Sequence, residues 1–144
     1  MADVHIEVLA EATDEVAEAI ARLIPQMTVN KVQPLTRDRL AKIISSGTVV
    51  VVARVDGVIA GTGVLGKVDQ LVGTKYWLED IVVDQAYRSQ GVARAIVKQL
   101  MALVPAELYS VNLSSKASRP EAQAWYQRLG FDLSSNIYRL RRQP

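Results

Sequence analysis

One stretch of the sequence decides the fold, and it reads Glu79-Asp80-Ile81-Val82-Val83-Asp84-Gln85-Ala86-Tyr87-Arg88-Ser89-Gln90-Gly91-Val92-Ala93. Its continuous apolar run of Ile81, Val82 and Val83 is typical of a strand that is covered on both faces. A short polar segment then leads into a helix that begins at Gly91. The first amides of a helix lack intrahelical partners and the helix dipole is positive at that end, so the backbone there can bind a phosphate. The stretch therefore predicts a central strand followed by an anion-binding turn.

The residues after this turn continue the helix and then return to the sheet. From Gly91 to Val104 apolar residues recur at helical spacing, and Pro105 prevents the helix from continuing. The segment from Leu108 to Leu113 is typical of a strand. A strand, a helix and a strand in this order predict a right-handed parallel crossover. A second interpretation of Gly91 and Ala93 stays open, because small residues also allow a helix to pack tightly on a strand.

The residues before the stretch predict antiparallel strands. Two β-branched runs, Thr48 to Val55 and Val58 to Leu65, are separated by Asp56-Gly57, a pair that favours a hairpin turn. The sheet is therefore mixed, with antiparallel and parallel neighbours. We expect a loop from Gly66 to Thr74 before the central strand starts at Tyr76. Earlier still, the pattern predicts a strand from Val4 to Leu9, a helix capped by Thr13 that runs to about Ile24, and a helix capped by Thr36 that ends near Gly47.

The C-terminal part predicts one more helix and the last strand. Apolar residues from Pro120 to Leu129 form one helical stripe, and the run from Ile137 to Leu140 favours a strand, with an extra strand possible at Phe131. The length of 144 residues is that of one ordinary domain, and no linker-like segment divides the chain. We therefore expect a single domain over residues 1–144.

The composition restricts the chemistry. The chain has no cysteine, and His5 is its only histidine, so we expect no metal site and no Ser-His-Asp triad, with His5 at the surface or a strand edge. The 17 basic and 15 acidic residues lack the basic excess of a general nucleic-acid binder. No segment approaches the roughly 20 apolar residues that span a bilayer, and no signal peptide is visible. The expected location is cytoplasmic, with no nucleic-acid or membrane partner.

Two motifs resemble those of one enzyme family. Arg88-Ser89-Gln90-Gly91-Val92-Ala93 is similar to Q/R-x-x-G-x-G/A, and Ala122-Gln123-Ala124-Trp125-Tyr126-Gln127-Arg128-Leu129-Gly130-Phe131 resembles A-x-x-F-Y-x-x-x-G-F. Both motifs, in this order, belong to the GNAT (GCN5-related) N-acetyltransferases. The resemblance implies the α/β (α+β) GNAT fold, in which a mostly antiparallel central sheet with one parallel crossover carries helices on both faces. It also implies that acetyl-CoA is the co-substrate.

The resemblance further implies which residues bind the coenzyme. In the family, successive amides of the first motif hold the pyrophosphate, and the preceding strand splays at a bulge and bonds the thioester arm through its backbone. Many members carry Asn where this chain has Arg119, so Asn112 or a water would replace that contact to the pantetheine arm. The implied coenzyme-binding residues are Ile81, Val82, Val83, Arg88, Ser89, Gln90, Gly91, Val92, Ala93, Asn112 and Arg119. For the 3′-phosphate the candidates are Arg88, Arg94, Lys98 and Lys116.

Acyl transfer to an amine needs a proton acceptor for the amine and a proton donor for the departing thiolate. Tyr126 matches the family's general acid, and its phenol, with an ordinary pKa near 10, stays protonated at neutral pH. A core tyrosine on the helical stripe is the alternative. Glu79 is the candidate general base because it precedes the buried run. A solvated Glu79 in an enzyme that binds an already neutral amine is the alternative.

The expected reaction is acetyl transfer from acetyl-CoA to a primary amine of a small molecule: an amino sugar, a polyamine or an amino acid. A pocket closed by residues 27–35 and 66–74 would favour such an acceptor, whereas an open groove would favour a protein or peptide N-acetyltransferase. A non-catalytic acyl-CoA sensor is a third hypothesis. Dimerisation is common in the family, so a homodimer is also an expectation.

Overall fold

The computed structural model describes residues 3–30, 32–108, 110–115 and 119–142. Its residues form two compact units, Met1–Asn112 and Leu113–Pro144. The single domain expected over residues 1–144 stays a prediction. Within the described ranges, no helix combines the length and the apolar character needed to cross a membrane.

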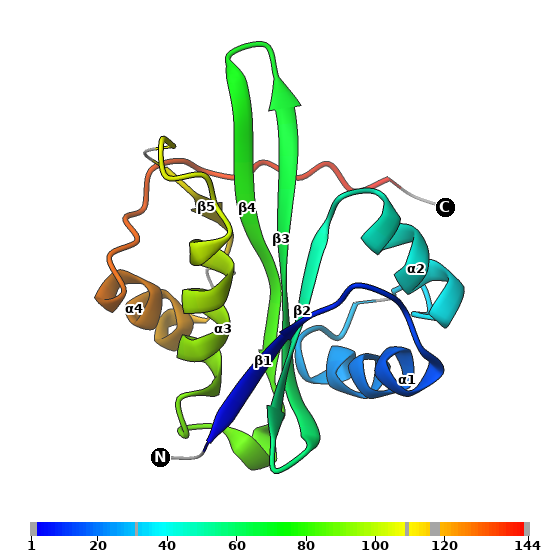
Figure 1. Cartoon of the computed structure of the whole chain (residues 1–144). Helices are drawn as coiled ribbons and strands as arrows, with labels where there is room; N and C mark the ends of the chain where they lie inside the picture. The colour runs from blue at the N-terminus through cyan, green and yellow to red at the C-terminus, as the bar shows by residue number, and fades with distance from the viewer. Residues whose placement is uncertain (1–2, 31, 109, 116–118, 143–144) are drawn as a thin grey trace. The chain divides into compact units, whose positions relative to one another are not determined.

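The elements follow the predicted order up to the last helix (Figure 1). They are β1 (Val4–Val8), α1 (Asp14–Leu23), the 3₁₀ helix η1 (Ile24–Gln26), α2 (Arg37–Ser45), β2 (Val49–Val55), β3 (Val58–Gln70), β4 (Gly73–Val83), the 3₁₀ helix η2 (Gln85–Tyr87), α3 (Val92–Ala102), β5 (Asn112–Leu113) and α4 (Pro120–Arg128). The sheet has the order β1-β2-β3-β4-β5. Strands β1 to β4 pair antiparallel, and β4 and β5 run parallel. The mixed sheet predicted from the sequence is therefore confirmed.

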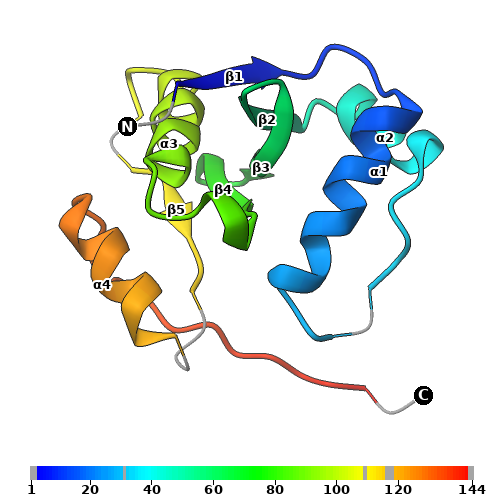
Figure 2. The same ribbon diagram turned by 90° about the horizontal axis from the view of Figure 1, so that it is seen from below.

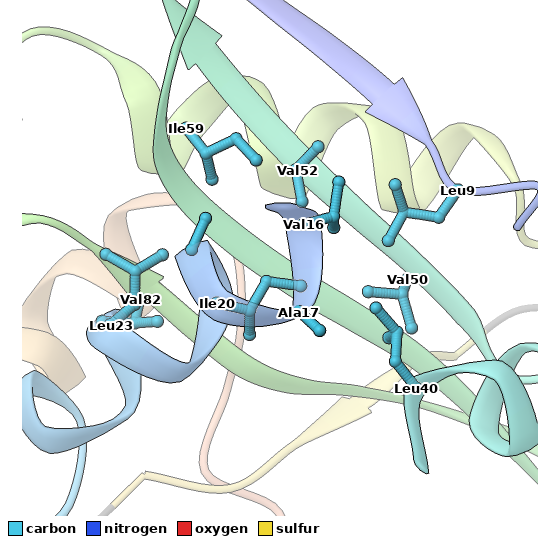
Figure 3. Packing of buried hydrophobic residues seen from close by; sticks show 11 residues of the cluster. Leu9, Val16, Ala17, Ile20, Leu23, Leu40, Val50, Val52, Ile59 and Val82 are labelled. Atoms are coloured by element: carbon cyan, nitrogen blue, oxygen red, sulfur yellow. The ribbon is translucent and has the colours of Figure 1, made fainter. Parts of the chain in front are cut away.

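Helices cover both faces of the sheet in the first unit, with α1 and α2 on one side and α3 on the other (Figure 2). Ile20 and Leu23 of α1 and Leu40 of α2 form one buried cluster with Val52 of β2 and Val82 of β4 (Figure 3). Apolar residues recur about every 3.6 residues on the helices and every 2 residues on the strands, and this spacing places the side chains on facing surfaces. Burial of this cluster is the main stabilising term on that side of the sheet.

Local capping explains where the first two helices begin. The hydroxyl of Thr13 accepts a hydrogen bond from the Val16 N–H at 3.2 Å, and that of Thr36 accepts one from the Arg39 N–H at 3.1 Å. Each bond satisfies an amide that has no partner in the helix. Both caps were predicted from the sequence.

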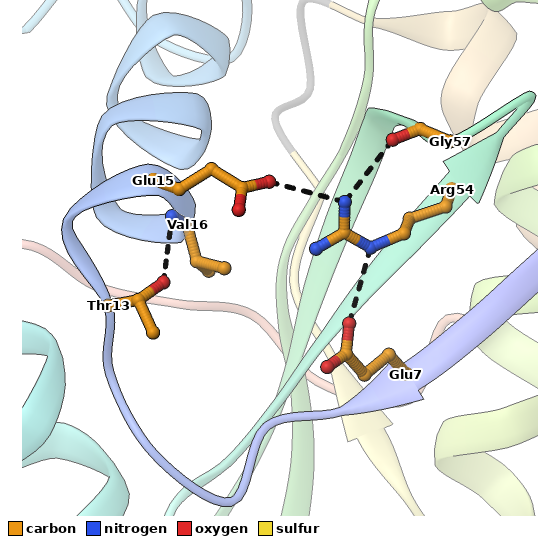
Figure 4. A network of polar contacts seen from close by, with 6 residues as sticks. All are labelled: Glu7, Thr13, Glu15, Val16, Arg54 and Gly57. Atoms are coloured by element: carbon orange, nitrogen blue, oxygen red, sulfur yellow. Dashed lines mark hydrogen bonds and ion pairs between the residues drawn. The ribbon is translucent and has the colours of Figure 1, made fainter.

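The turn between β2 and β3 also follows the prediction. Asp56 and Gly57 have φ angles of 51° and 79°, as the tight hairpin turn requires. Next to this turn, Arg54 bonds Glu7 of β1 at 3.3 Å, Glu15 of α1 at 3.4 Å and the Gly57 carbonyl at 3.2 Å (Figure 4). One arginine thus joins the edge strand, the first helix and the hairpin. His5 lies exposed on the same edge strand, as expected.

The loop predicted from Gly66 to Thr74 is wrong. Strand β3 continues to Gln70 and β4 already begins at Gly73, so only Leu71 and Val72 form the connection. The two strands stay paired to the end of the hairpin, where Gln70 faces Gly73. Across this end, the Thr74 hydroxyl donates a hydrogen bond to the Asp69 carboxylate at 2.6 Å. The sequence of this hairpin is polar and therefore resembled a loop.

Three other predicted strand segments are shortened or missing. The strand expected from Leu108 to Leu113 is reduced to Asn112–Leu113, with Tyr109 outside the described residues. The segments at Phe131 and from Ile137 to Leu140 form neither strand nor helix. Ile137 and Leu140 are exposed. A strand exists only where a neighbour pairs with it, and the sheet described contains no such neighbour for these residues.

Helix α3 packs directly on the backbone of β3 because two glycines lie beneath it. A Cβ atom at Gly63 would lie 2.6 Å from Ile96 Cγ2 and 3.2 Å from Leu100 Cδ1, and one at Gly61 would lie 3.1 Å from Ile96 Cδ1. Ile96 and Leu100 are completely buried. A side chain at Gly63 would therefore push the helix away from the sheet.

We expect Gly63→Ala to lower the free energy of unfolding by about 1–3 kcal/mol, because the added methyl overpacks the interface with α3. Urea denaturation measures this loss. Gly66→Ala is the matched control, since Gly66 lies on the same strand and a Cβ there meets nothing within 4 Å. Equal stabilities of the two variants would contradict the close packing.

Candidate active site

A β-bulge interrupts β4, the strand for which the family resemblance implied one. Thr62 pairs with Val82 and Val64 pairs with Glu79, so Asp80 and Ile81 both lie opposite Gly63. Asp80 has a φ of 53°, which is the left-handed conformation. A bulge bends its strand and breaks the regular hydrogen-bond ladder. Backbone groups of β4 near Asp80 are thereby freed from the regular pattern.

Two acidic side chains lie at this bulge. Burial raises the pKa of Glu79, and the neighbouring charge of Asp80 raises it further. Asp80 is exposed as a whole residue, yet desolvation of its carboxyl also raises its pKa. A carboxylate with a raised pKa is a stronger base than a fully solvated one. The bulge therefore carries carboxylates that accept a proton more readily than solvated ones do.

Hydrogen bonds within the turn and to the adjoining strands hold the segment from β4 to α3. The Asp84 carboxylate accepts from the Ala86 N–H at 3.0 Å, and the Asp84 N–H donates to the Ala60 carbonyl at 2.7 Å. The Arg88 Nε donates to the Val83 carbonyl at 3.1 Å. Arg88 thus closes the turn with its side chain. These bonds fix the backbone that leads into α3.

The start of α3 offers a row of free amides. Ser89 and Gly91 have φ angles of 63° and 83°, and Gly91 is the N-cap without a side-chain cap. Within the described part of the chain, none of the N–H groups of residues 89–94 donates a hydrogen bond, and the Ala95 N–H is the first that does, to Gly91. Consecutive free amides at a helix start attract an anion. The predicted anion-binding turn thus has the geometry that it needs.

Strand β4 and the start of α3 bring most of the predicted coenzyme-binding residues into one stretch. They are Ile81, Val82, Val83, Arg88, Ser89, Gln90, Gly91, Val92 and Ala93. Val82, Val83 and Val92 are buried. Asn112 is half-buried on β5. Their roles in coenzyme binding stay predictions.

The basic candidates for the 3′-phosphate divide into three groups. Arg94 and Lys98 are exposed, four residues apart on α3. Arg88 already donates from Nε to a backbone carbonyl. Lys116 lies outside the described residues. The two exposed cations on α3 are therefore the free ones among the candidates that the structure describes.

Tyr126 lies in the second unit, on α4. Its ring packs edge-to-face against Trp125 and Phe131, with centroid distances of 5.1 and 6.1 Å. Burial raises its pKa above the ordinary value of 10.0, and the charge of Arg119, just before the helix, opposes that rise. Tyr126 is only half-buried, so it is not a fully enclosed core residue of this unit. Its phenol is protonated at neutral pH, as a proton donor must be.

One hydrogen bond near the turn had no signal in the sequence. The side-chain oxygen of Gln26, on η1, accepts from the Gln85 N–H at 2.8 Å. The two residues are 59 positions apart, and neither belongs to a motif. In the described ranges, no cluster of three or more His, Cys, Asp or Glu side chains is arranged to hold a metal ion.

Comparison with known proteins adds to this geometry. The sequence matches the model of the acetyltransferase (GNAT) family over residues 17–131. No curated protein matches it. Among solved structures, glucosamine-6-phosphate N-acetyltransferase from Arabidopsis thaliana has a TM-score of 0.79 and 26% identity, with 96% of this chain and 98% of that chain covered.

Two further structures share the fold. An acetyltransferase from Trypanosoma brucei has a TM-score of 0.77 and 23% identity, with 96% of this chain and 99% of that chain covered. An aminoglycoside N-acetyltransferase in complex with CoA has a TM-score of 0.72 and 16% identity, with 99% and 97% covered. Because the family match takes in the bulged strand, the free amides of α3 and Tyr126 alike, the chain belongs to the GNAT family and is an acyl-CoA-dependent N-acyltransferase.

Proposed function

We propose that this enzyme acetylates a primary amine of a small molecule, with an amino sugar ahead of a polyamine or an amino acid. The carboxyl pair of Glu79 and Asp80 at the bulge carries the proposal. A free amine is a cation in water, and two adjacent carboxylates attract it electrostatically. The 26% identity with a glucosamine-6-phosphate N-acetyltransferase supports the amino sugar.

In the proposed reaction, the amine nitrogen attacks the thioester carbonyl, a C–N bond forms and the C–S bond breaks. Glu79 takes the proton that the amine loses, directly or through water, and Tyr126 gives a proton to the departing thiolate. The backbone of residues 81–83 stabilises the developing oxyanion, a contribution typically of about 3 kcal/mol. The free amides of residues 89–93 hold the pyrophosphate of acetyl-CoA.

The hairpin of β3 and β4 takes the place of one of the two segments that could enclose the acceptor. Residues 66–70 and 73–74 are strand, so the loop that would have helped to close a pocket over a small acceptor is not formed. Residues 27–35 remain the candidate wall. Acetylation of a peptide and a role as an acyl-CoA sensor are therefore the alternatives that an activity assay must separate. A cytoplasmic location and a homodimer stay predictions.

The function is tested by thiol release from acetyl-CoA across a panel of amino sugars, polyamines, amino acids and peptides. We expect turnover with an amino sugar, and a loss of about 10²-fold in kcat for Tyr126→Phe, because the leaving thiolate then lacks its proton donor. Tyr138→Phe is the matched control, since Tyr138 is exposed in the C-terminal segment. Turnover only with peptides would contradict the small acceptor, and coenzyme binding without any turnover would favour the sensor.

The coenzyme turn is tested with a pair of glycine variants. Gly91 and Gly47 have φ angles of 83° and 91°, so an alanine at either position carries similar backbone strain, about 1 kcal/mol. We expect only Gly91→Ala to reduce the thermal shift produced by coenzyme A, because its methyl group crowds the free amides. If both variants keep the full shift, the phosphate is bound elsewhere.

Glu79→Gln is expected to lower activity while it raises stability. Because the native pKa of Glu79 is raised, the folded state holds its proton to higher pH than the unfolded chain. The native protein therefore loses folding stability as the pH rises from 4.5, the ordinary pKa of this carboxyl, through its raised pKa. The melting temperature of Glu79→Gln should exceed that of the native chain at alkaline pH and match it near pH 4. Full activity of this variant would exclude Glu79 as the base.

A further inference from the structure

The hydrogen bond between Gln26 and Gln85 joins two segments with different proposed tasks. Gln26 ends η1, and the candidate acceptor wall of residues 27–35 follows it directly. Gln85 is the first residue of η2, at the beginning of the turn that leads to the free amides of α3. Among the residues that the structure describes, it is the single hydrogen bond between residues 24–36 and residues 84–91.

The Gln26 side of this bond is anchored in the core. Ile24 and Met27, on either side of Gln26, pack against the buried cluster beneath the sheet. Pro25, at the start of η1, restricts the backbone further because its φ is fixed. The backbone of Gln26 is thus held from below, and its side chain reaches out to the turn.

The Gln85 side of the bond belongs to a segment that needs support. The other hydrogen bonds of the turn come from its own residues or from the adjoining strands. Beyond them, Ser89 and Gly91 adopt left-handed φ angles and the following amides are free. The bonds of the turn end at Arg88, so a contact from outside adds to what holds the residues that follow.

We infer that Gln26 is a positioning residue that ties the coenzyme turn to the segment at the end of α1. This inference rests on the proposed binding of the coenzyme at that turn. Because the bond orders both segments, coenzyme that stabilises the turn also orders residues 27–30 on the other side of the bond. The two events are linked, and the linkage acts equally in both directions.

The test removes the two ends of the bond separately. Gln26→Met keeps the length of the side chain and deletes its acceptor oxygen. Gln85→Pro deletes the donor N–H and suits its position, since proline is tolerated at the first residue of a helix and Asp84 has a ψ of 134°, compatible with a following proline. Gln85→Ala, which keeps the N–H, is the reference for the proline variant.

Coenzyme A binding is measured by calorimetry for the native chain, Gln26→Met, Gln85→Ala, Gln85→Pro and the two double variants. We expect loss of the Gln26 acceptor oxygen or of the Gln85 N–H to weaken coenzyme A binding about fivefold, the effect of one neutral hydrogen bond. Loss of both ends should weaken binding no more than loss of one, because they share a single bond. The KM for acetyl-CoA should rise with kcat changed less than about twofold.

Amide hydrogen exchange supplies the second measurement. Coenzyme A should slow exchange at residues 27–30 in the native chain and leave it unchanged in Gln26→Met. Three results would each overturn the inference while coenzyme binding stands. The losses of affinity from the two substitutions could multiply in the double variant, Gln26→Met could bind coenzyme A with native affinity, or coenzyme A could still slow amide exchange at residues 27–30 in Gln26→Met. A native chain that does not bind coenzyme A would overturn the proposed site as well.

Discussion

The contact between Ile96 and the bare backbone of Gly63 is the constraint on which the site depends. A Cβ at Gly63 would lie 2.6 Å from Ile96, so α3 can lie this close to β3 only over a glycine. The same glycine faces Asp80 and Ile81 across the bulge. One position therefore allows the helix to approach and faces the irregular part of β4, and it determines where the free amides of α3 lie relative to that strand.

The candidate site concentrates groups that lower stability. The amides of residues 89–94 have no partners in the described chain, Ser89 and Gly91 hold left-handed backbones, and Glu79 and Asp80 are carboxyls with raised pKa values. Strain and unmet polar groups persist where the surrounding structure holds them. Here the apolar cluster on one face of the sheet and α3 on the other provide that support. This division of tasks is usual for enzymes, whose active sites are rarely at their most stable composition.

Two side chains connect distant parts of the first unit in different ways. Arg54 bonds Glu7 and Glu15, which lie 47 and 39 residues away, and so joins the edge strand to the first helix. Gln26 bonds a backbone amide 59 residues away and so joins the end of that helix to the turn. The ionic contacts lie beside the β2–β3 hairpin, whereas the neutral one touches the segment that precedes α3.

The sequence by itself determined the features whose causes are local. Thr13 and Thr36 cap helices through bonds to residues three positions on, Asp56-Gly57 turns a hairpin, and Gly91 permits the left-handed start of α3. The tertiary structure alone decided the extension of β3 and β4 through the expected loop, the absence of a strand at Ile137 and the bond of Gln26. The resemblance implied a bulge in the central strand, and the structure placed it at Asp80. A cap or a turn is closed by neighbours in the chain, so its residues reveal it. Register, strand pairing and long-range hydrogen bonds depend on which distant segments meet, and no short pattern of residues records that choice.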